Sequence, residues 1–233
     1  MREIVMPGDK KNALGTALLR WLFEQLERAA REPVLLTGAG DAFSAGLDLR
    51  EIASLDAAGL TAYLELLERV VARLWVHPGP TVAAVNGHAI AGGCVLALCC
   101  DHRVASENPR LKIGLNEVAL GVRFPPRVLS IVTARVPAHA VGPVLFGGRL
   151  FSPNDALGMG LVDEVSADVG TTARARLAEL SRHPPDGYAA LKADMRGARV
   201  EWSADERVTF LRDVLPAWTA PETRARIEAV LKR

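Results

Sequence analysis

The sequence predicts an α/β fold that ends in a helical extension. Short apolar runs alternate with amphipathic stretches as far as Pro125-Pro126, and helical patterns dominate after that point. Strands that alternate with helices in this way are typical of an α/β layer architecture. The chain has 233 residues, of which 49% are hydrophobic and 24% are charged. Such a length and composition indicate one compact globular domain, or at most two small ones.

Short runs of apolar residues predict the strands. A strand that is buried on both faces of a parallel sheet reads as a continuous apolar run, without the alternation of a half-exposed strand. Residues 33–37 and 81–85 are such runs, and a glycine follows each of them closely. The same reasoning predicts strands, in chain order, at residues 3–6, 33–37, 81–85, 103–106, 111–114 and 161–165.

Leucines at a spacing of four residues predict the first helix. Leu14, Leu18, Leu22 and Leu26 would share one helix face, and Asn12 is the candidate N-cap. A long stretch of the same kind ends before Pro78 and Pro80, which cannot continue a helix. Helical patterns further along the chain predict helices at residues 56–77, 93–100, 126–135, 137–146, 153–159, 168–183, 186–198 and 203–232.

The charge balance gives no sign of a nucleic-acid partner. The formal net charge is +1, and basic and acidic residues are interspersed, whereas nucleic-acid-binding domains usually carry a basic stripe. No apolar run approaches the ~20 residues that span a bilayer. The first residues also lack the apolar core of a signal peptide. We therefore expect a cytoplasmic protein with no membrane partner.

The cysteines and histidines indicate neither a disulfide framework nor a metal site. Cys94, Cys99 and Cys100 lie in one apolar run, where cysteine behaves as a small hydrophobic residue, so we expect buried thiols. The histidines have no metal-ligand spacing. Asp101 and Arg103 are two residues apart, and we expect them to form a structural ion pair.

Two glycine-rich turns are the candidate sites of chemistry. Residues 38–48 and 86–93 each follow a predicted buried strand, and the second turn opens a helix. Glycine permits tight turns and close approach of a ligand, and a helix start directs unpaired N–H groups at one point. Two such turns could hold one negatively charged oxygen, although either could be only a structural connection. Neither has the spacing of a P-loop or of a dinucleotide fingerprint.

Together with residues 114–117, these two turns resemble the crotonase (enoyl-CoA hydratase/isomerase) family. Residues 43–48, Phe-Ser-Ala-Gly-Leu-Asp, are similar to the first oxyanion segment of the family, and residues 86–103 are similar to the second. Residues 151–165 resemble the region that follows the active-site half of the chain in this family. The resemblance implies a crotonase-like spiral of repeated ββα units with a C-terminal helical extension. It divides the chain into an active-site core, 1–170, and a helical region, 171–233, for oligomerisation and CoA contact.

The resemblance also assigns roles to particular residues. It implies that the backbone N–H groups of Ala45 and Gly92 bind the enolate oxygen of an acyl-CoA thioester, with Glu117 as acid and base. Preorganised donors of this kind are often the largest single catalytic effect. Apolar neighbours of Glu117 would raise its pKa by desolvation. The expected substrate-binding residues are Ser44, Ala45, Gly46, Leu47, Asp48, Gly92 and Asn116, although Asp48 could simply cap a helix and Asn116 could simply form the turn.

Position 95 discriminates between reactions within the family. The family's hydratases use two glutamates, and the position of the first is Val95 in this chain. Valine cannot transfer a proton, so the pattern resembles the Δ3,Δ2-enoyl-CoA isomerases of the mitochondrial type, which move a double bond with one base. The open alternatives are hydration, thioester hydrolysis or decarboxylation with Glu117 alone and, in another class, a non-catalytic acyl-CoA-binding protein.

The resemblance finally implies partners and cofactors. Coenzyme A enters as part of the substrate, and we expect no other cofactor and no metal. A homotrimer or a dimer of trimers is implied. Basic residues of the last predicted helix could reach a CoA phosphate or could form a solvated face; they are Arg224, Arg226, Lys232 and Arg233.

Overall fold

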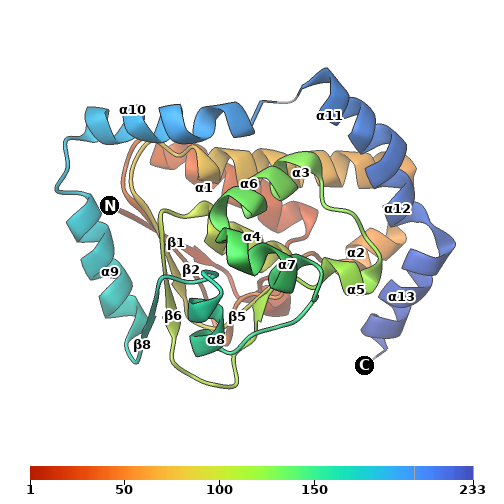
Figure 1. Ribbon diagram of the computed structural model, residues 1–233, viewed down its shortest axis with the longest axis horizontal. Coiled ribbons are helices and arrows are strands. Elements are labelled where there is room, and N and C mark those ends of the chain that lie inside the picture. Colours follow the sequence, from red (N-terminus) through yellow and green to blue (C-terminus); the bar gives the residue numbers. More distant parts are fainter. Residues whose placement is uncertain (202, 233) are drawn as a thin grey trace.

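Two parallel sheets organise the first part of the chain (Figure 1). The computed structural model describes residues 1–201 and 203–232. Within them, the larger sheet has five strands in the spatial order β1 (Arg2–Met6), β2 (Val34–Gly38), β4 (Thr81–Val85), β6 (His102–Ser106) and β8 (Glu164–Ser166). The smaller sheet has three strands in the order β3 (Ala42–Ser44), β5 (His88–Ile90) and β7 (Ile113–Gly114). All neighbouring pairs are parallel.

From β2 to β8, strands alternate between the two sheets along the chain. The pairs β2–β3, β4–β5 and β6–β7 each give their first strand to the larger sheet and their second to the smaller one, and helices follow each pair. The predicted α/β spiral of repeated ββα units is therefore confirmed. Strands β3 and β5 were not predicted, because runs of three residues inside glycine-rich segments carry too little periodicity to read.

Helices surround these sheets and make up most of the chain after β7. The helical elements are η1 (Asp9–Asn12), α1 (Thr16–Ala29), α2 (Leu49–Ser54), α3 (Ala57–Trp75), α4 (Gly92–Cys99), α5 (Glu117–Leu120), α6 (Pro126–Arg135), α7 (Ala138–Leu145), α8 (Pro153–Gly158), α9 (Val169–Leu180), α10 (Pro185–Arg196), η2 (Gly197–Arg199), α11 (Ala204–Thr209), η3 (Phe210–Val214), α12 (Leu215–Thr219) and α13 (Pro221–Leu231).

The prediction of one continuous helix over residues 203–232 was wrong. The chain leaves helical geometry at Ala220, which has ψ 137°, and Pro221 starts a new helix. Proline disfavours helical geometry in the residue before it, which explains the break. The preceding segment also contains one π-helical turn, η3. Figure 1 shows the resulting blue arm, which passes from α11 down to α13 beside α2 and α5.

Asn12 does not cap the first helix as predicted. Helix α1 begins at Thr16, and Asn12 is fully buried before it. The Asn12 side chain accepts a hydrogen bond from the Gly8 N–H at 2.6 Å and donates one to the Ala42 carbonyl at 2.9 Å. These bonds hold a loop in which residues 10–12 all have positive φ, a conformation that is costly for residues with side chains.

Both faces of the larger sheet are buried. The main hydrophobic core contains Leu36 and Ala83 together with residues of α1 and α3. The opposite face is covered by α9, whose Ala173 and Leu177 pack against Leu35 and neighbouring strand residues. Alternate strand residues point to opposite faces, so burial on both sides explains the continuous apolar runs in the sequence. The division at residue 170 stays a prediction; α9 begins there and packs on the sheet.

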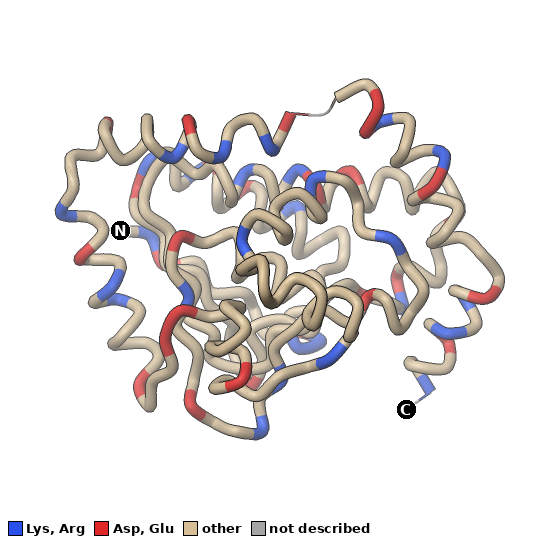
Figure 2. The backbone as a smooth tube through the Cα atoms, viewed as in Figure 1, with Lys and Arg blue, Asp and Glu red and all other residues tan. Residues whose placement is uncertain are grey.

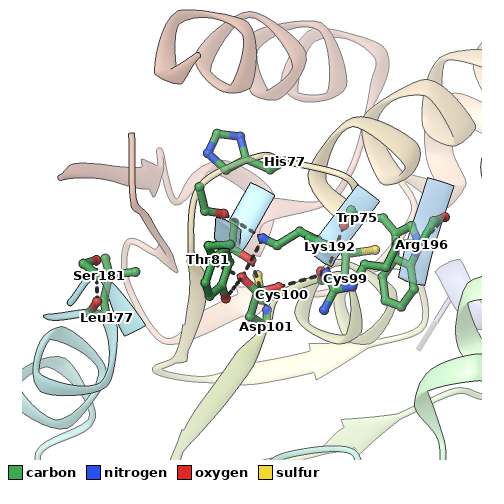
Figure 3. Close-up of polar contacts among 12 residues, drawn as sticks. Trp75, His77, Thr81, Cys99, Cys100, Asp101, Leu177, Ser181, Lys192 and Arg196 are labelled. Atoms are coloured by element: carbon green, nitrogen blue, oxygen red, sulfur yellow. Dashed lines mark hydrogen bonds and ion pairs between the residues drawn. The ribbon is translucent and has the colours of Figure 1, made fainter. Parts of the chain in front are cut away.

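A buried ionic cluster attaches α10 to the core (Figure 3). The Asp101 carboxylate lies 2.6 Å from Lys192 Nζ and 2.9 Å from Arg196 Nη1, two α10 residues on one helix face. It also accepts hydrogen bonds from the Tyr188 hydroxyl and the Thr81 N–H, both at 2.8 Å. Burial alone would raise the pKa of Asp101, but the positive charges of Lys192 and Arg196 hold it below its usual value.

The predicted ion pair between Asp101 and Arg103 is therefore not formed. Arg103 Nη2 instead lies 2.6 Å from Asp163, and the Arg103 N–H donates to the same carboxylate. Asp101 precedes β6, and its carboxylate turns towards β4 and α10. The spacing of Asp101 and Arg103 in the sequence could not show their actual partners, because α10 and Asp163 come much later in the chain.

Charges are mixed over the rest of the molecule. Figure 2 shows Lys and Arg interspersed with Asp and Glu along the helices and loops. Among the described residues, no helix combines the length and apolar character that a bilayer crossing needs. The three cysteines are fully buried and unpaired by disulfides, as predicted.

Candidate active site

Three segments that follow the strands of the smaller sheet meet at one place. Strand β3 leads into residues 45–48, β5 leads into residues 91–93, and β7 leads into residues 115–117. The three strands are parallel and adjacent, so their carboxyl ends lie at the same edge of the sheet. Ligands bind outside the carboxyl ends of strands in open α/β sheets. The fold thus brings together the two glycine-rich turns and Glu117.

Glycines let the two turns approach each other. Gly46 has φ 88°, and a Cβ added to it would lie only 2.7 Å from the Ile90 carbonyl oxygen. A Cβ added to Gly93 would collide with the Ser44 carbonyl. Any other residue would push the turns apart, which is the physical reason for glycine at these two positions.

Leu47 and Gly92 each present a backbone N–H that has no acceptor among residues 1–201 and 203–232. Gly92 is the first residue of α4, where a helix leaves its N–H groups unpaired. The two residues are neighbours, because a Cβ added to Gly92 would lie 3.0 Å from Leu47 Cδ2. Ala91 has φ 50°, an unfavourable value for a residue with a side chain, so the surrounding structure must hold this turn in place.

The structure corrects the role predicted for Ala45. The Ala45 N–H donates to the Lys11 carbonyl at 3.0 Å, so it is already used within the protein. Ala45 still lines the cavity described below. The free donor of this turn lies two residues further on, at Leu47, which was predicted only as a substrate-binding residue.

The other predicted residues of the first turn support its shape. The Ser44 hydroxyl donates to the Asn12 carbonyl at 2.8 Å and accepts from the Gly46 N–H at 3.2 Å. Asp48 caps α2, because its carboxylate accepts from the N–H groups of Arg50 and Glu51. The polar side-chain groups of Ser44 and Asp48 thus form hydrogen bonds within the protein.

Glu117 is a buried carboxylic acid that faces the cavity. It opens the short helix α5, only 8% of it is exposed, and its Oε2 has no hydrogen-bond partner among the described residues. Burial raises its pKa to about 7, and the backbone N–H groups of Glu117 and Asn116 only partly oppose this effect. A carboxylate poised near neutral pH is suited to take up and release a proton.

Two cavities with shared lining residues border this carboxyl group. The first, of about 260 Å³, is lined by Ala45, Leu47, Leu49, Ile90, Ala91, Asn116, Glu117, Leu120, Val122, Leu150, Trp218 and Val230. The second, of about 20 Å³, is lined by Leu47, Leu67, Gly92, Val95, Glu117, Arg123, Phe124, Pro125, Val128 and Trp218. Leu47, Glu117 and Trp218 belong to both. Val95 therefore lies beside Glu117, in an apolar wall.

Trp218 was missed by sequence reasoning. It comes from α12, far along the chain, yet it is 3% exposed and borders both cavities. Its indole N–H donates to the Arg123 carbonyl at 2.9 Å. A tryptophan near the end of a helical region carries no sequence signal of a site, because its position depends on how the C-terminal helices fold back.

A third cavity has a basic rim. Its volume is about 450 Å³, and it shares Ala45, Leu47 and Leu49 with the first cavity. Lys10 and Lys11 lie on its edge, in the loop that Asn12 holds. Lys10 Nζ lies 2.9 Å from the Asp48 carboxylate, which raises the pKa of Lys10.

Two of the basic residues predicted for the last helix bond to backbone carbonyls of the protein. Arg224 donates to the Leu55 carbonyl at 3.1 Å, and Arg226 donates to the Leu120 carbonyl at 3.4 Å. These bonds tie α13 to the body of the protein. Arg233 lies outside the described residues, and the predicted contact of this helix with a CoA phosphate stays a prediction.

Asn116 and the metal-ligand types complete the predicted site features. Asn116 lines the first cavity and its side chain does not cap α5. No group of three or more His, Cys, Asp or Glu side chains in the described part of the chain could hold a metal ion.

The fold is that of a crotonase-type protein, as comparison with solved structures shows. Human mitochondrial Δ3-Δ2-enoyl-CoA isomerase superposes with a TM-score of 0.89 at 30% identity, over 95% of this chain and 88% of the other. An enoyl-CoA hydratase from Bacillus halodurans superposes with a TM-score of 0.84 at 24% identity, over 97% and 95% of the two chains, which supports the fold alone.

The sequence model of the enoyl-CoA hydratase/isomerase family matches residues 4–218, and the chain belongs to this family of enzymes. Mouse mitochondrial enoyl-CoA delta isomerase 1 is 37% identical over 155 residues, 66% of this chain and 54% of the relative. The human enzyme of that name is 34% identical over 80% of this chain and 64% of the relative. A putative enoyl-CoA hydratase of Thermus thermophilus is 37% identical over 68% and 64%. The match thus spans less than two thirds of these relatives.

Proposed function

We propose that this protein isomerises 3-enoyl-CoA thioesters to 2-enoyl-CoA thioesters, with Glu117 as its acid and base. One observation carries the proposal: the buried Glu117 carboxyl faces a cavity that it shares with Gly92 and Val95. A single proton carrier beside an anion-binding turn matches a reaction that removes one proton and returns it nearby. Relatives named as isomerases and as hydratases both support a reaction on an enoyl-CoA.

The proposed reaction has two proton transfers. The Glu117 carboxylate takes a proton from C2 of the 3-enoyl thioester, and the electron pair forms an enolate whose oxygen is negative. The same carboxyl group then returns the proton at C4, so the double bond moves from C3–C4 to C2–C3. General acid–base transfer of this kind contributes about 10²–10⁴ in rate.

The N–H groups of Leu47 and Gly92 would bind the enolate oxygen. Neither N–H has an acceptor within the described residues, the two groups belong to neighbouring turns, and strain at Ala91 requires a rigid surrounding. Donors that are already in place need no reorganisation when the charge develops, and each is worth about 10²–10³ in rate. The two N–H groups lie at the cavities that Glu117 borders.

Val95 weighs against ordinary hydration. Hydration by the two-glutamate mechanism needs a second carboxyl group to activate water, and Val95 occupies the wall where it would lie. Among the described residues that line the two cavities around Glu117, no other Asp or Glu is present. A water molecule in this apolar cavity would have only one carboxyl group to activate it.

The basic cavity gives a place for the nucleotide end of coenzyme A. It adjoins the first cavity through Ala45, Leu47 and Leu49, so the thiol arm would pass from the rim to the carbonyl site. Lys10 and Lys11 on its edge supply positive charge for phosphates. We also propose a homotrimer and a cytoplasmic location. Light scattering tests the oligomeric state, and cell fractionation tests the location.

The test follows formation of the conjugated 2-enoyl thioester from trans-3-hexenoyl-CoA by ultraviolet absorbance, with a parallel reaction on crotonyl-CoA in water. We expect isomerisation by the wild type, negligible hydration, and loss of isomerisation in Glu117→Gln. Glu107→Gln is the matched control, because Glu107 is exposed and does not line either cavity at Glu117.

Other results point to the alternatives. Hydration of crotonyl-CoA by the wild type would contradict the isomerase assignment. Free CoA released from an acyl-CoA would indicate hydrolysis, and loss of carbon dioxide from a malonyl-type thioester would indicate decarboxylation. Tight acyl-CoA binding with no turnover, unchanged in Glu117→Gln, would indicate a binding protein.

A further inference from the structure

The small cavity beside Glu117 has room for few atoms. Its volume is about 20 Å³, and a single buried water already needs about 10–15 Å³. Beyond Val95, its wall consists of Leu67, Phe124, Pro125, Val128 and Trp218. An acyl chain whose C4 atom lies at Glu117 would therefore find room for little more than one or two further carbons.

A much larger apolar groove lies on the other side of this wall. Its volume is about 550 Å³, and it shares only Arg123 and Phe124 with the small cavity. Its other lining residues are mostly apolar, among them Val118, Leu129, Leu145, Phe146 and Val214. The segment that carries Arg123 and Phe124 is thus the partition between the small cavity and a groove whose volume is sufficient for an alkyl chain.

Two contacts with the C-terminal arm hold this partition in place. The Trp218 indole N–H donates to the Arg123 carbonyl at 2.9 Å, and the Arg123 guanidinium lies 3.6 Å from the Asp213 carboxylate. Trp218 is buried, so the loss of its hydrogen bond would leave a buried polar group without a partner. Pro125 and Pro126 further restrict the backbone that follows.

We propose that Phe124, held by the contact between Trp218 and Arg123, determines acyl-chain length and restricts this protein to short-chain thioesters of about six carbons or fewer. The inference rests on the proposed function for the placement of the acyl chain. Phe124 blocks the path from the small cavity to the apolar groove. Longer chains would bind only if the partition opened.

The experiment measures binding of saturated acyl-CoA thioesters from butyryl to dodecanoyl by titration calorimetry. Each newly buried methylene is worth about fourfold in affinity. For the wild type we expect affinity to rise up to hexanoyl-CoA and then to level off or fall. In Phe124→Ala the cavity and the groove would join, and decanoyl-CoA should bind at least ~10-fold more tightly than hexanoyl-CoA.

Two further variants control for unfolding and for non-specific effects. Trp218→Phe keeps an aromatic ring but removes the hydrogen bond to Arg123, so it should also shift binding towards longer chains. Phe146 lines only the groove and is 82% exposed. Phe146→Ala should leave the wild-type profile unchanged and should reduce the gain for decanoyl-CoA in the Phe124→Ala background.

The outcomes separate this inference from the proposed function. Wild-type affinity that keeps rising to decanoyl-CoA would overturn the chain-length limit, as would a Phe124→Ala profile identical to that of the wild type. Saturated thioesters cannot isomerise, so these results do not depend on catalysis. A length limit without turnover of 3-hexenoyl-CoA would contradict only the proposed reaction, and absence of binding to every acyl-CoA would overturn both.

Discussion

Glu117 and Val95 line the same small cavity, although one opens α5 and the other lies in α4. The pair places a proton-transfer group opposite an apolar side chain. This relationship defines what the cavity can do, because a second carboxyl group at position 95 would change both its chemistry and its electrostatics.

Val95→Glu should introduce hydration of crotonyl-CoA, because it supplies a second carboxyl group beside Glu117. The measurement is the loss of conjugated absorbance in water, with Val95→Gln as a control that has similar size but cannot ionise. Burial of a new polar group in this wall should lower the free energy of unfolding by ~2 kcal/mol or more. Equal hydration rates for the two variants would mean that position 95 does not contribute a proton carrier.

The rate of isomerisation should rise with pH through about 7. Burial raises the pKa of Glu117 to about 7, and only the deprotonated form can take a proton from C2. The activity limb should therefore lie well above the usual range of a glutamate, and Glu117→Gln should lower kcat/KM by about 10²–10⁴. A limb near pH 4.5 would show that this carboxyl group is not desolvated.

The free energy of unfolding should fall over the pH range in which the rate of isomerisation rises. The folded-state pKa of Glu117 is raised, so between pH 4.5 and about 7 the folded state holds a proton that the unfolded state has lost. Stability therefore falls as pH rises through this window, by about 3 kcal/mol in total. Urea unfolding at pH 5 and pH 8 measures it, and the part due to Glu117 should be absent from Glu117→Gln.

Asp101→Asn should destabilise the protein strongly. The change leaves Lys192 and Arg196 buried without their carboxylate, which costs about 3–5 kcal/mol for a buried pair. Asp186→Asn is the control, because Asp186 forms an exposed pair with Arg31 and should cost less than ~1 kcal/mol. Similar unfolding midpoints for the two variants would contradict an anchoring role for the cluster in Figure 3.

The charges of the Asp101 cluster also determine how protein stability changes at acid pH. The pKa of Asp101 is held below its ordinary value of 3.8 in the folded state. Its contribution to stability is therefore present above that value and is lost as pH falls through the lower folded-state pKa. Wild-type stability should drop at acid pH by more than that of Asp101→Asn.

Alanine at Lys10 and Lys11 should weaken binding of CoA thioesters. Both lysines line the third cavity and are exposed to solvent, where a charge contributes modestly, so the double variant should bind only several-fold less tightly. A pantetheine thioester lacks the nucleotide, and its affinity should not change. An equal loss for both ligands would mean that the loop shape, and not its charge, had been altered.

Much of the fold could be predicted because the sequence patterns that indicate its strands and helices are local. Residues 33–37 and 81–85 are apolar throughout, which is the direct result of a sheet buried on both faces. The amphipathic stretch over residues 56–77 corresponds to α3, with Asp56 as its N-cap. The prediction for Asn12 was wrong, because a side chain that caps helices well also bonds well to loop backbone, and only the fold decides between the two.

The sequence by itself determined the two glycine turns, Glu117 and the absence of a glutamate at position 95, because these depend on residue type and order. Only the tertiary structure decided which N–H groups are free. The loop at residues 10–12 places the Lys11 carbonyl at the Ala45 N–H, whereas the Leu47 N–H has no acceptor in the described part of the chain. It also decided that Trp218 closes the cavity, since contacts between residues far apart in the chain arise only when the C-terminal helices fold back.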